Sequence, residues 1–186
     1  MKKTGPAWLF LVAGMTAMVV SGCSGSKNKA TAENFQAALN TYFANRSQCL
    51  FPIALHFPYE VDPSTSPKVE QARMDALMHA ALLKREADKS IHVYIYSLTP
   101  AGERATSSFC YGHRQITSID HFTPPAKANG FLETQVSYHY TVTEVPVWAK
   151  TKEIQDAFPE LAKALAGNAT GKTTLANAGA GWQVPE

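Results

Sequence analysis

The sequence has very little excess charge. Its 186 residues include 17 Lys and Arg against 15 Asp and Glu, a formal net charge of +2. This balance excludes a strongly basic body that binds nucleic acid through bulk electrostatics, and it also excludes an acidic tail. The apolar run at residues 7–20 has 14 residues, fewer than the roughly 20 that a membrane-spanning helix needs. An apolar fraction of 45% nevertheless fits a folded protein.

Motifs that identify common enzymes are also missing. The chain has no Gly-x-Ser-x-Gly elbow, no His-Glu-x-x-His sequence and no closely spaced pair of histidines. Residues 166–173 match a loose phosphate-loop pattern, but they follow a predicted helix instead of a strand, so we interpret the match as chance. We therefore predict no catalytic residue, no cofactor and no metal, and hence a protein that is not an enzyme.

The N-terminal residues have the three parts of a secretory signal. Lys2 and Lys3 form a basic start, residues 7–20 are apolar, and small residues follow. The sequence Val20-Ser21-Gly22-Cys23 resembles the lipobox of bacterial lipoproteins. The resemblance implies cleavage before Cys23, diacylglycerol on its thiol and a further acyl chain, such as palmitate, on the new amine.

Three acyl chains would anchor the chain stably in a membrane. Ser24 follows the cysteine, as in lipoproteins of the bacterial outer membrane, so we expect an outer-membrane anchor facing the periplasm. Loss of Lys2 and Lys3 leaves equal numbers of basic and acidic side chains. The predicted organisation is a signal peptide at 1–22, an acylated tether at 23–32 and one domain at 33–186.

Cys49 and Cys110 remain after Cys23 is acylated. An even number of cysteines in an oxidising compartment predicts a disulfide. The alternative is a reactive thiol, in which Cys110 is a nucleophile that His113 or His121 activates.

The pattern of apolar residues changes from helical to alternating along the chain. We expect Thr31 to cap the first helix, and Ser66 to cap the second with Pro67 at its first position. In residues 134–145, Val136 and every second residue after it should face a core. The predicted elements are helices at 31–47, 67–87 and 152–166, strands at 91–96, 108–122 and 134–145, and a terminal hairpin within 173–184. This order predicts an α+β fold, a small antiparallel sheet packed by helices.

The segment from Tyr96 to Gly102 resembles the Tyr-x-Leu-Thr-x-x-Gly signature of winged-helix domains. With the two helices before it, the resemblance covers about residues 31–122. It implies a winged-helix-like first half, and DNA binding if the signal peptide is misread. The alternative is that Thr99 and Pro100 start a helical turn.

The sequence thus predicts a lipid-anchored, non-enzymatic envelope lipoprotein whose body binds or scaffolds another envelope component, with no nucleic-acid partner. The first alternative is an envelope hydrolase that uses Cys110, His113 and His121. The second is a winged-helix DNA-binding protein.

Overall fold

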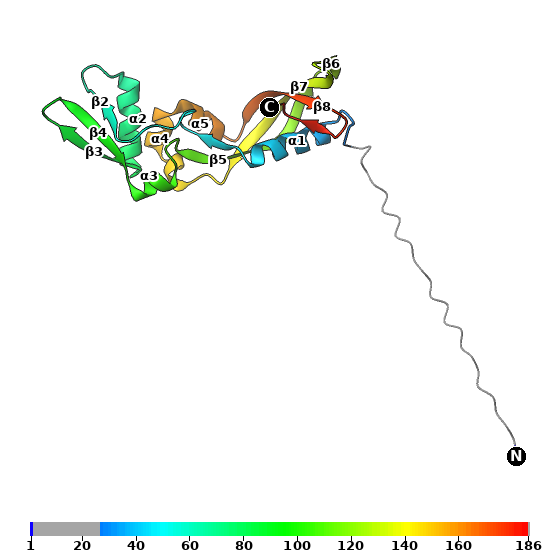
Figure 1. Cartoon of the computed structure of the whole chain (residues 1–186), viewed down its shortest axis with the longest axis horizontal. Coiled ribbons are helices and arrows are strands. Elements are labelled where there is room, and N and C mark those ends of the chain that lie inside the picture. Colours follow the sequence, from blue (N-terminus) through cyan, green and yellow to red (C-terminus); the bar gives the residue numbers. More distant parts are fainter. Residues whose placement is uncertain (2–26, 186) are drawn as a thin grey trace.

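The computed structural model describes Met1 and residues 27–185. The predicted lipidation site Cys23 and the predicted signal peptide, apart from Met1, lie outside the described residues. Figure 1 shows an elongated α+β body, which confirms the predicted fold class. In the described part of the chain, no helix is both long enough and apolar enough to span a membrane.

The body contains two antiparallel sheets and short helices. The helices are α1 (Ala32–Ala44), α2 (Lys68–His79), α3 (Pro100–Arg104), the 3-10 helix η2 (Val147–Lys150), α4 (Lys152–Ala157) and α5 (Pro159–Leu165). The strands are β1 (Ser47–Cys49), β2 (Tyr59–Val61), β3 (Leu83–Asp88), β4 (Val93–Leu98), β5 (Cys110–Phe122), β6 (Ala126–Ala128), β7 (Phe131–Thr143), β8 (Ala169–Asn177) and β9 (Trp182–Gln183).

The larger sheet is built around the pairing of β5 with β7. Its strand order is β1-β5-β7-β8-β9, with β6 paired to β7. Val136, Tyr138 and Tyr140 of β7 are buried, which confirms the predicted alternation. They form a core with α1, where Phe35 is fully buried and its ring centroid lies 5.0 Å from that of Trp182. Full burial of one such side chain stabilises the fold by about 1.5–3 kcal/mol.

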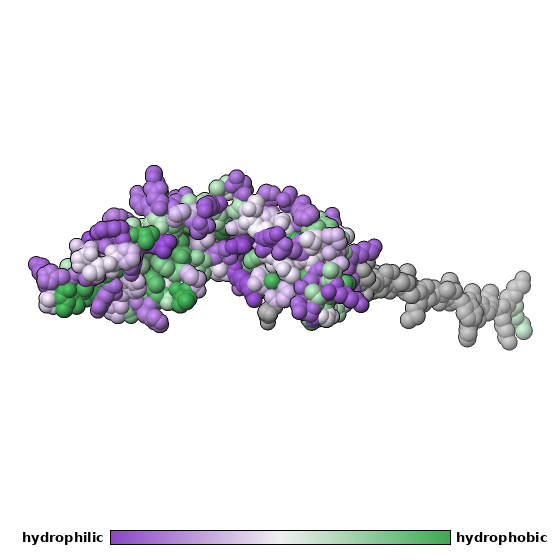
Figure 2. All heavy atoms as spheres, turned by 90° about the horizontal axis from the view of Figure 1, so that it is seen from above, coloured by the Kyte–Doolittle hydropathy of each residue, from purple (hydrophilic) through white to green (hydrophobic). Residues whose placement is uncertain are grey.

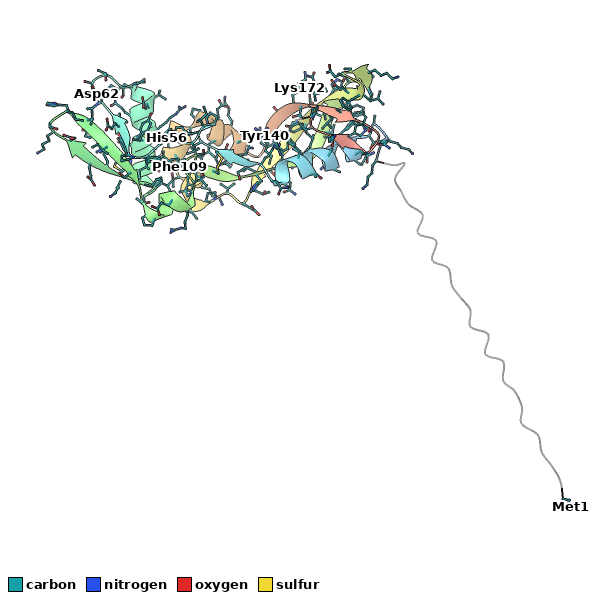
Figure 3. The ribbon with its side chains drawn as sticks, viewed as in Figure 1. Met1, His56, Asp62, Phe109, Tyr140 and Lys172 are labelled. Atoms are coloured by element: carbon teal, nitrogen blue, oxygen red, sulfur yellow. A yellow bond between two sulfur atoms is a disulfide. The ribbon has the colours of Figure 1, made fainter. Side chains whose placement is uncertain are left out.

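The smaller sheet lies at the opposite end of the body, as Figure 1 shows, and has the order β2-β4-β3. Its core includes Leu77 of α2, Tyr96 of β4 and Phe109, all almost completely buried. Figure 3 shows Phe109 at this end of the molecule, with Tyr140 nearer the middle and Lys172 over the larger sheet. The two cores are therefore successive along β5, which contributes Tyr111 to one and Ile116 to the other.

The first helix begins as predicted. The Thr31 hydroxyl accepts a hydrogen bond from the backbone N–H of Asn34 at 3.3 Å, an N-cap contact. The helix ends at Ala44, three residues before the predicted position. On its inner side, Asn40 accepts a 2.7 Å hydrogen bond from the Ile116 N–H, which fixes α1 against β5 where the β5–β7 register shifts.

The prediction of a second helix from residue 67 to 87 is wrong at both ends. Pro67, not Ser66, is the N-cap, and no side chain makes a capping hydrogen bond there. The helix stops at His79, and Ala81 has a φ of 58°, which ends the helical path. Residues 83–88 form β3 because they pair with every residue of β4. The hydrogen-bonded pairing of β3 with β4 has therefore outweighed the helix that the local sequence predicted.

The strand predicted at 91–96 lies two residues later. His92 has a φ of 56° in the β3–β4 turn, so the strand starts at Val93. The helix predicted at 152–166 is two helices, because Phe158 leaves helical geometry and Pro159 starts α5. The terminal hairpin is confirmed as β8 paired with β9, and β8 is longer than predicted.

The segment resembling the winged-helix signature starts a helix. The Thr99 hydroxyl accepts a hydrogen bond from the Gly102 N–H at 3.1 Å and caps α3. A Cβ on Gly102 would lie 2.1 Å from the Leu82 carbonyl oxygen, so close packing excludes a side chain there. The winged-helix resemblance stays a prediction. Any shared core is limited, because α1 packs on the larger sheet and α2 on the smaller one.

Gly171, within the loose phosphate-loop pattern, is instead a packing residue of β8. It pairs with Tyr138, whose ring carbons and hydroxyl oxygen would lie 2.5–2.7 Å from an added Cβ. We expect Gly171→Ala to lower the free energy of unfolding by about 1–3 kcal/mol through overpacking. The exposed neighbour Lys172 provides the control, since Lys172→Ala should leave stability unchanged. Denaturant unfolding curves check both, and coincident midpoints for wild type and Gly171→Ala would contradict this packing.

Candidate functional site

The disulfide predicted between Cys49 and Cys110 is present. Its sulfur atoms lie 2.07 Å apart, and it joins β1 to β5 across a sequence separation of 61 residues. The two cysteines are also partners in the strand register. Because its sulfur is bonded to Cys49, Cys110 has no thiol to act as a nucleophile, and the proposed Cys110-based site is not available in this state.

His113, three residues after Cys110, makes two side-chain contacts that connect three segments. Its Nε2 lies 3.2 Å from the Oγ of Ser47 on β1. Its Nδ1 lies 3.2 Å from Oε2 of Glu144, the residue that follows β7. The strand register explains this grouping, because His113 is paired with Ser47 on one side and with Thr143 on the other. We call Ser47, His113 and Glu144 the His113 relay.

Unusual backbone geometry surrounds the relay. Gly112 has a φ of +133°, and a Cβ there would lie 2.2 Å from the carbonyl oxygen of Thr143. Glu144 has a φ of 59°, a sparsely populated region for a residue with a side chain. Non-glycine residues in such regions cost about 1–3 kcal/mol and cluster at functional sites. The relay thus depends on a close approach of β5 to β7 and on a strained turn.

An open cavity of about 440 Å³ borders the relay. Asn40, Arg114 and Gln115 line it together with His113 and Glu144. The Arg114 Nε–H donates a 2.8 Å hydrogen bond to Gln48, and its guanidinium carbon lies 4.6 Å from the centroid of the Tyr140 ring. The cavity lining therefore includes a positive charge whose side chain is held in place by Gln48 and Tyr140.

A serine, an imidazole and a carboxylate in this order form the relay that activates hydroxyl nucleophiles. The carboxylate orients the imidazole through Nδ1, and Nε2 is left to accept the serine proton. The side chain of Glu144 is 77% exposed and that of His113 is 29% exposed. Glu144 is therefore more solvated than the buried carboxylate of the serine-protease triad.

His121, the other histidine proposed for the hydrolase, is not part of this group. It lies opposite Ser137 in the β5–β7 ladder, eight residues after His113, or roughly 25 Å along a strand. Among the residues that the structure describes, no three His, Cys, Asp or Glu side chains are placed to share a metal ion.

Ser47 and Glu144 were not singled out from the sequence. They are separated from His113 by 66 and 31 residues, so no local motif connects them. Only the register of β1, β5 and β7 brings them together.

The chain matches no protein-family model, no curated protein and no solved structure.

The relay predicts the tautomer of neutral His113. The carboxylate of Glu144 should hold the proton on Nδ1 and leave Nε2 unprotonated to accept from Ser47. Ring 15N shifts of His113, at a pH where the imidazole is neutral, should show the Nδ1–H form in wild type. In Glu144→Ala the Nε2–H form should gain population. His121 provides an internal control, and an Nε2–H tautomer in the wild type would contradict the relay.

Proposed function

We propose that this chain is a lipid-anchored lipoprotein of the bacterial cell envelope, held at the outer membrane and facing the periplasm. Its body would bind or scaffold another envelope component. The acyl chains on Cys23 would supply the membrane attachment, with no metal or cofactor in the mechanism.

The observation that carries this proposal is the disulfide between Cys49 and Cys110 in a chain that begins with a lipobox-like segment. Structural disulfides persist in oxidising compartments such as the periplasm and are rare in the cytosol. The bridge constrains a loop of about 60 residues in the unfolded chain, which the chain-entropy model values at about 4 kcal/mol. Export of the chain to the periplasm is therefore consistent with a fold that is stabilised by a disulfide.

The arrangement of the body supports a role in presenting one end to a partner. The described chain resumes at Lys27, four residues after Cys23, and four residues span at most about 14 Å. Since α1 begins at Ala32, an anchor on Cys23 would hold the end with the larger sheet near the membrane. The end with the smaller sheet lies farther along the long axis in Figure 1.

The end with the smaller sheet also carries exposed apolar side chains. Ile53 is 78% exposed, and Val69 and Ile91 are more than half exposed. On the face that Figure 2 shows, the strongest apolar colouring lies over this end. At the end with the larger sheet, Phe131 and Leu132 are also exposed. A contiguous exposed apolar patch marks a protein contact site, and Ile53, Val69 and Ile91 are the first positions at which to test for one.

A second candidate function, an envelope hydrolase, is favoured by the His113 relay, with Ser47 in place of Cys110 as nucleophile. Ser47 Oγ would attack the carbonyl carbon of an ester, and its proton would pass to Nε2 of His113. His113 would return that proton to the leaving alcohol, and water would then release the acid from Ser47.

The first proposal predicts the covalent state of the protein extracted from membranes. Its intact mass should lack residues 1–22 and include three acyl chains, and two thiols should become alkylatable only after reduction. The matched variant Cys23→Ser should keep the disulfide and lose both acylation and cleavage. A full-length, unacylated chain with free thiols would contradict the proposal and favour the cytosolic, winged-helix alternative.

The hydrolase candidate predicts that an alkyl fluorophosphonate labels Ser47. Removing the base should slow labelling about 100-fold, so His113→Ala should be nearly unlabelled. His121→Ala, on the same strand but outside the relay, should react as wild type does. Tandem mass spectrometry locates the label. Absence of label on Ser47 in folded, disulfide-bonded protein would exclude this candidate.

A further inference from the structure

A small cavity lies where α2, β1 and β5 meet the junction of α4 and α5. Its volume is about 90 Å³. Arg73 of α2 and Tyr111 of β5 line it, together with Phe158 and Leu161 from the junction, and the disulfide contributes Cys49. This cavity is separate from the His113 relay.

Arg73 provides the unusual chemistry of this cavity. Its Nε is buried, and it donates no hydrogen bond to any residue that the structure describes. The guanidinium carbon lies 5.3 Å from the centroid of the Phe158 ring, a cation–π contact that holds the charge at the cavity. More than nine in ten buried polar groups have a hydrogen-bond partner, so a buried guanidinium N–H without an acceptor needs an explanation.

Nearby carboxylates have other partners. Glu70, on the same helix, accepts a 2.6 Å hydrogen bond from the Tyr59 hydroxyl. Asp75 accepts from Arg85 at 2.8 Å and from Tyr96 at 3.0 Å.

Glu160 also lines the cavity, but it is paired with Lys163 at 2.9 Å and its side chain is 85% exposed. Its carboxylate therefore does not reach the buried Nε of Arg73, which lacks a hydrogen-bond partner among the described residues.

The remaining walls favour a ligand with an oxygen-rich head and a short apolar stem. Phe158 and Leu161 are almost completely buried and give the cavity apolar sides. Tyr111 is 6% exposed, and burial raises the pKa of its hydroxyl, so the group stays protonated and able to donate at neutral pH. The volume equals that of about three water molecules, which is also the size of a carboxylate with one or two carbons.

We propose that this cavity binds a single carboxylate group, with Arg73 as its charged hydrogen-bond donor. A carboxylate is planar and accepts two parallel hydrogen bonds from a guanidinium edge. Because the Arg73 Nε has almost no accessible surface, the side chain must shift slightly for its Nε–H and a neighbouring N–H to present that edge to the cavity. The inference rests on the proposed binding function and names the chemistry of its ligand. The carboxylate belongs either to a small free acid or to the C-terminus of a peptide.

The test uses the protein as it is extracted from membranes in detergent, labelled with 15N-arginine. The Nε–Hε resonances of its five arginines are followed during titration, and that of Arg73 is assigned by its loss in Arg73→Lys. The probes are sodium propionate, N-acetyl-trialanine and the C-terminal amide of the same peptide. We expect a saturable shift of the Arg73 resonance with a free carboxylate and none with the amide.

The two sources give different patterns. Saturation by propionate alone indicates a small free acid, and tighter saturation by the peptide acid indicates a peptide C-terminus. Arg73→Gln should weaken binding of the effective probe at least tenfold, the equivalent of one charge-assisted hydrogen bond. Arg104→Gln, an exposed arginine on α3, should bind as wild type does.

No saturable shift of the Arg73 resonance in wild type would overturn the inference and leave water as the occupant of the cavity. Apart from the assignment, which uses Arg73→Lys, this readout comes from the wild-type protein. The intact mass of the same preparation separates the two proposals, because a correctly processed protein that binds no carboxylate rejects only the cavity site. An unprocessed protein that does bind it rejects only the envelope assignment.

Discussion

The pairing of β5 with β7 is the interaction on which the rest of the structure depends. Both strands have 13 residues and together form the centre of the larger sheet. β5 also extends beyond that sheet's core, so that Tyr111 is buried in the core of the smaller sheet while Ile116 is buried beneath α1. One continuous strand therefore joins the two cores, and α5 also contributes to both, with Leu161 in one and Ala164 in the other.

Both candidate sites, the His113 relay and the Arg73 cavity, lie at the start of β5 for a structural reason. β1 pairs only with this part of the strand, and the disulfide covalently attaches it there. The same attachment places Ser47 beside His113 on one side and Cys49 at the wall of the Arg73 cavity on the other. A short edge strand alone would hold neither position firmly, because three residues supply few hydrogen bonds. The disulfide thus positions Ser47 and Cys49 in addition to stabilising the fold.

Local patterns predicted the elements well where one face of an element is buried along its whole length. Alternation in β7 and capping by Thr31 are both present, because each depends on residues close in sequence. The prediction failed at residues 83–87, which were assigned to the end of the second helix. There the partner strand β4 supplies a full ladder of pairs, and Arg85 also reaches Asp75 on α2. Such long-range contacts cannot be predicted from the spacing of apolar residues along the sequence.

The sequence by itself predicted the α+β class and a disulfide between Cys49 and Cys110, both of which the structure shows, and its lipobox-like segment predicts the address. These follow from composition, parity and local pattern. The tertiary structure alone decided which groups meet: Ser47 with His113 and Glu144, and Arg73 with Phe158 beside a cavity. The physical reason is strand register and core packing. Strand register brings together residues that are dozens of positions apart in the sequence. Core packing leaves the Nε of Arg73 without a hydrogen-bond acceptor among the described residues. Neither register nor packing can be read from the order of residues along the chain.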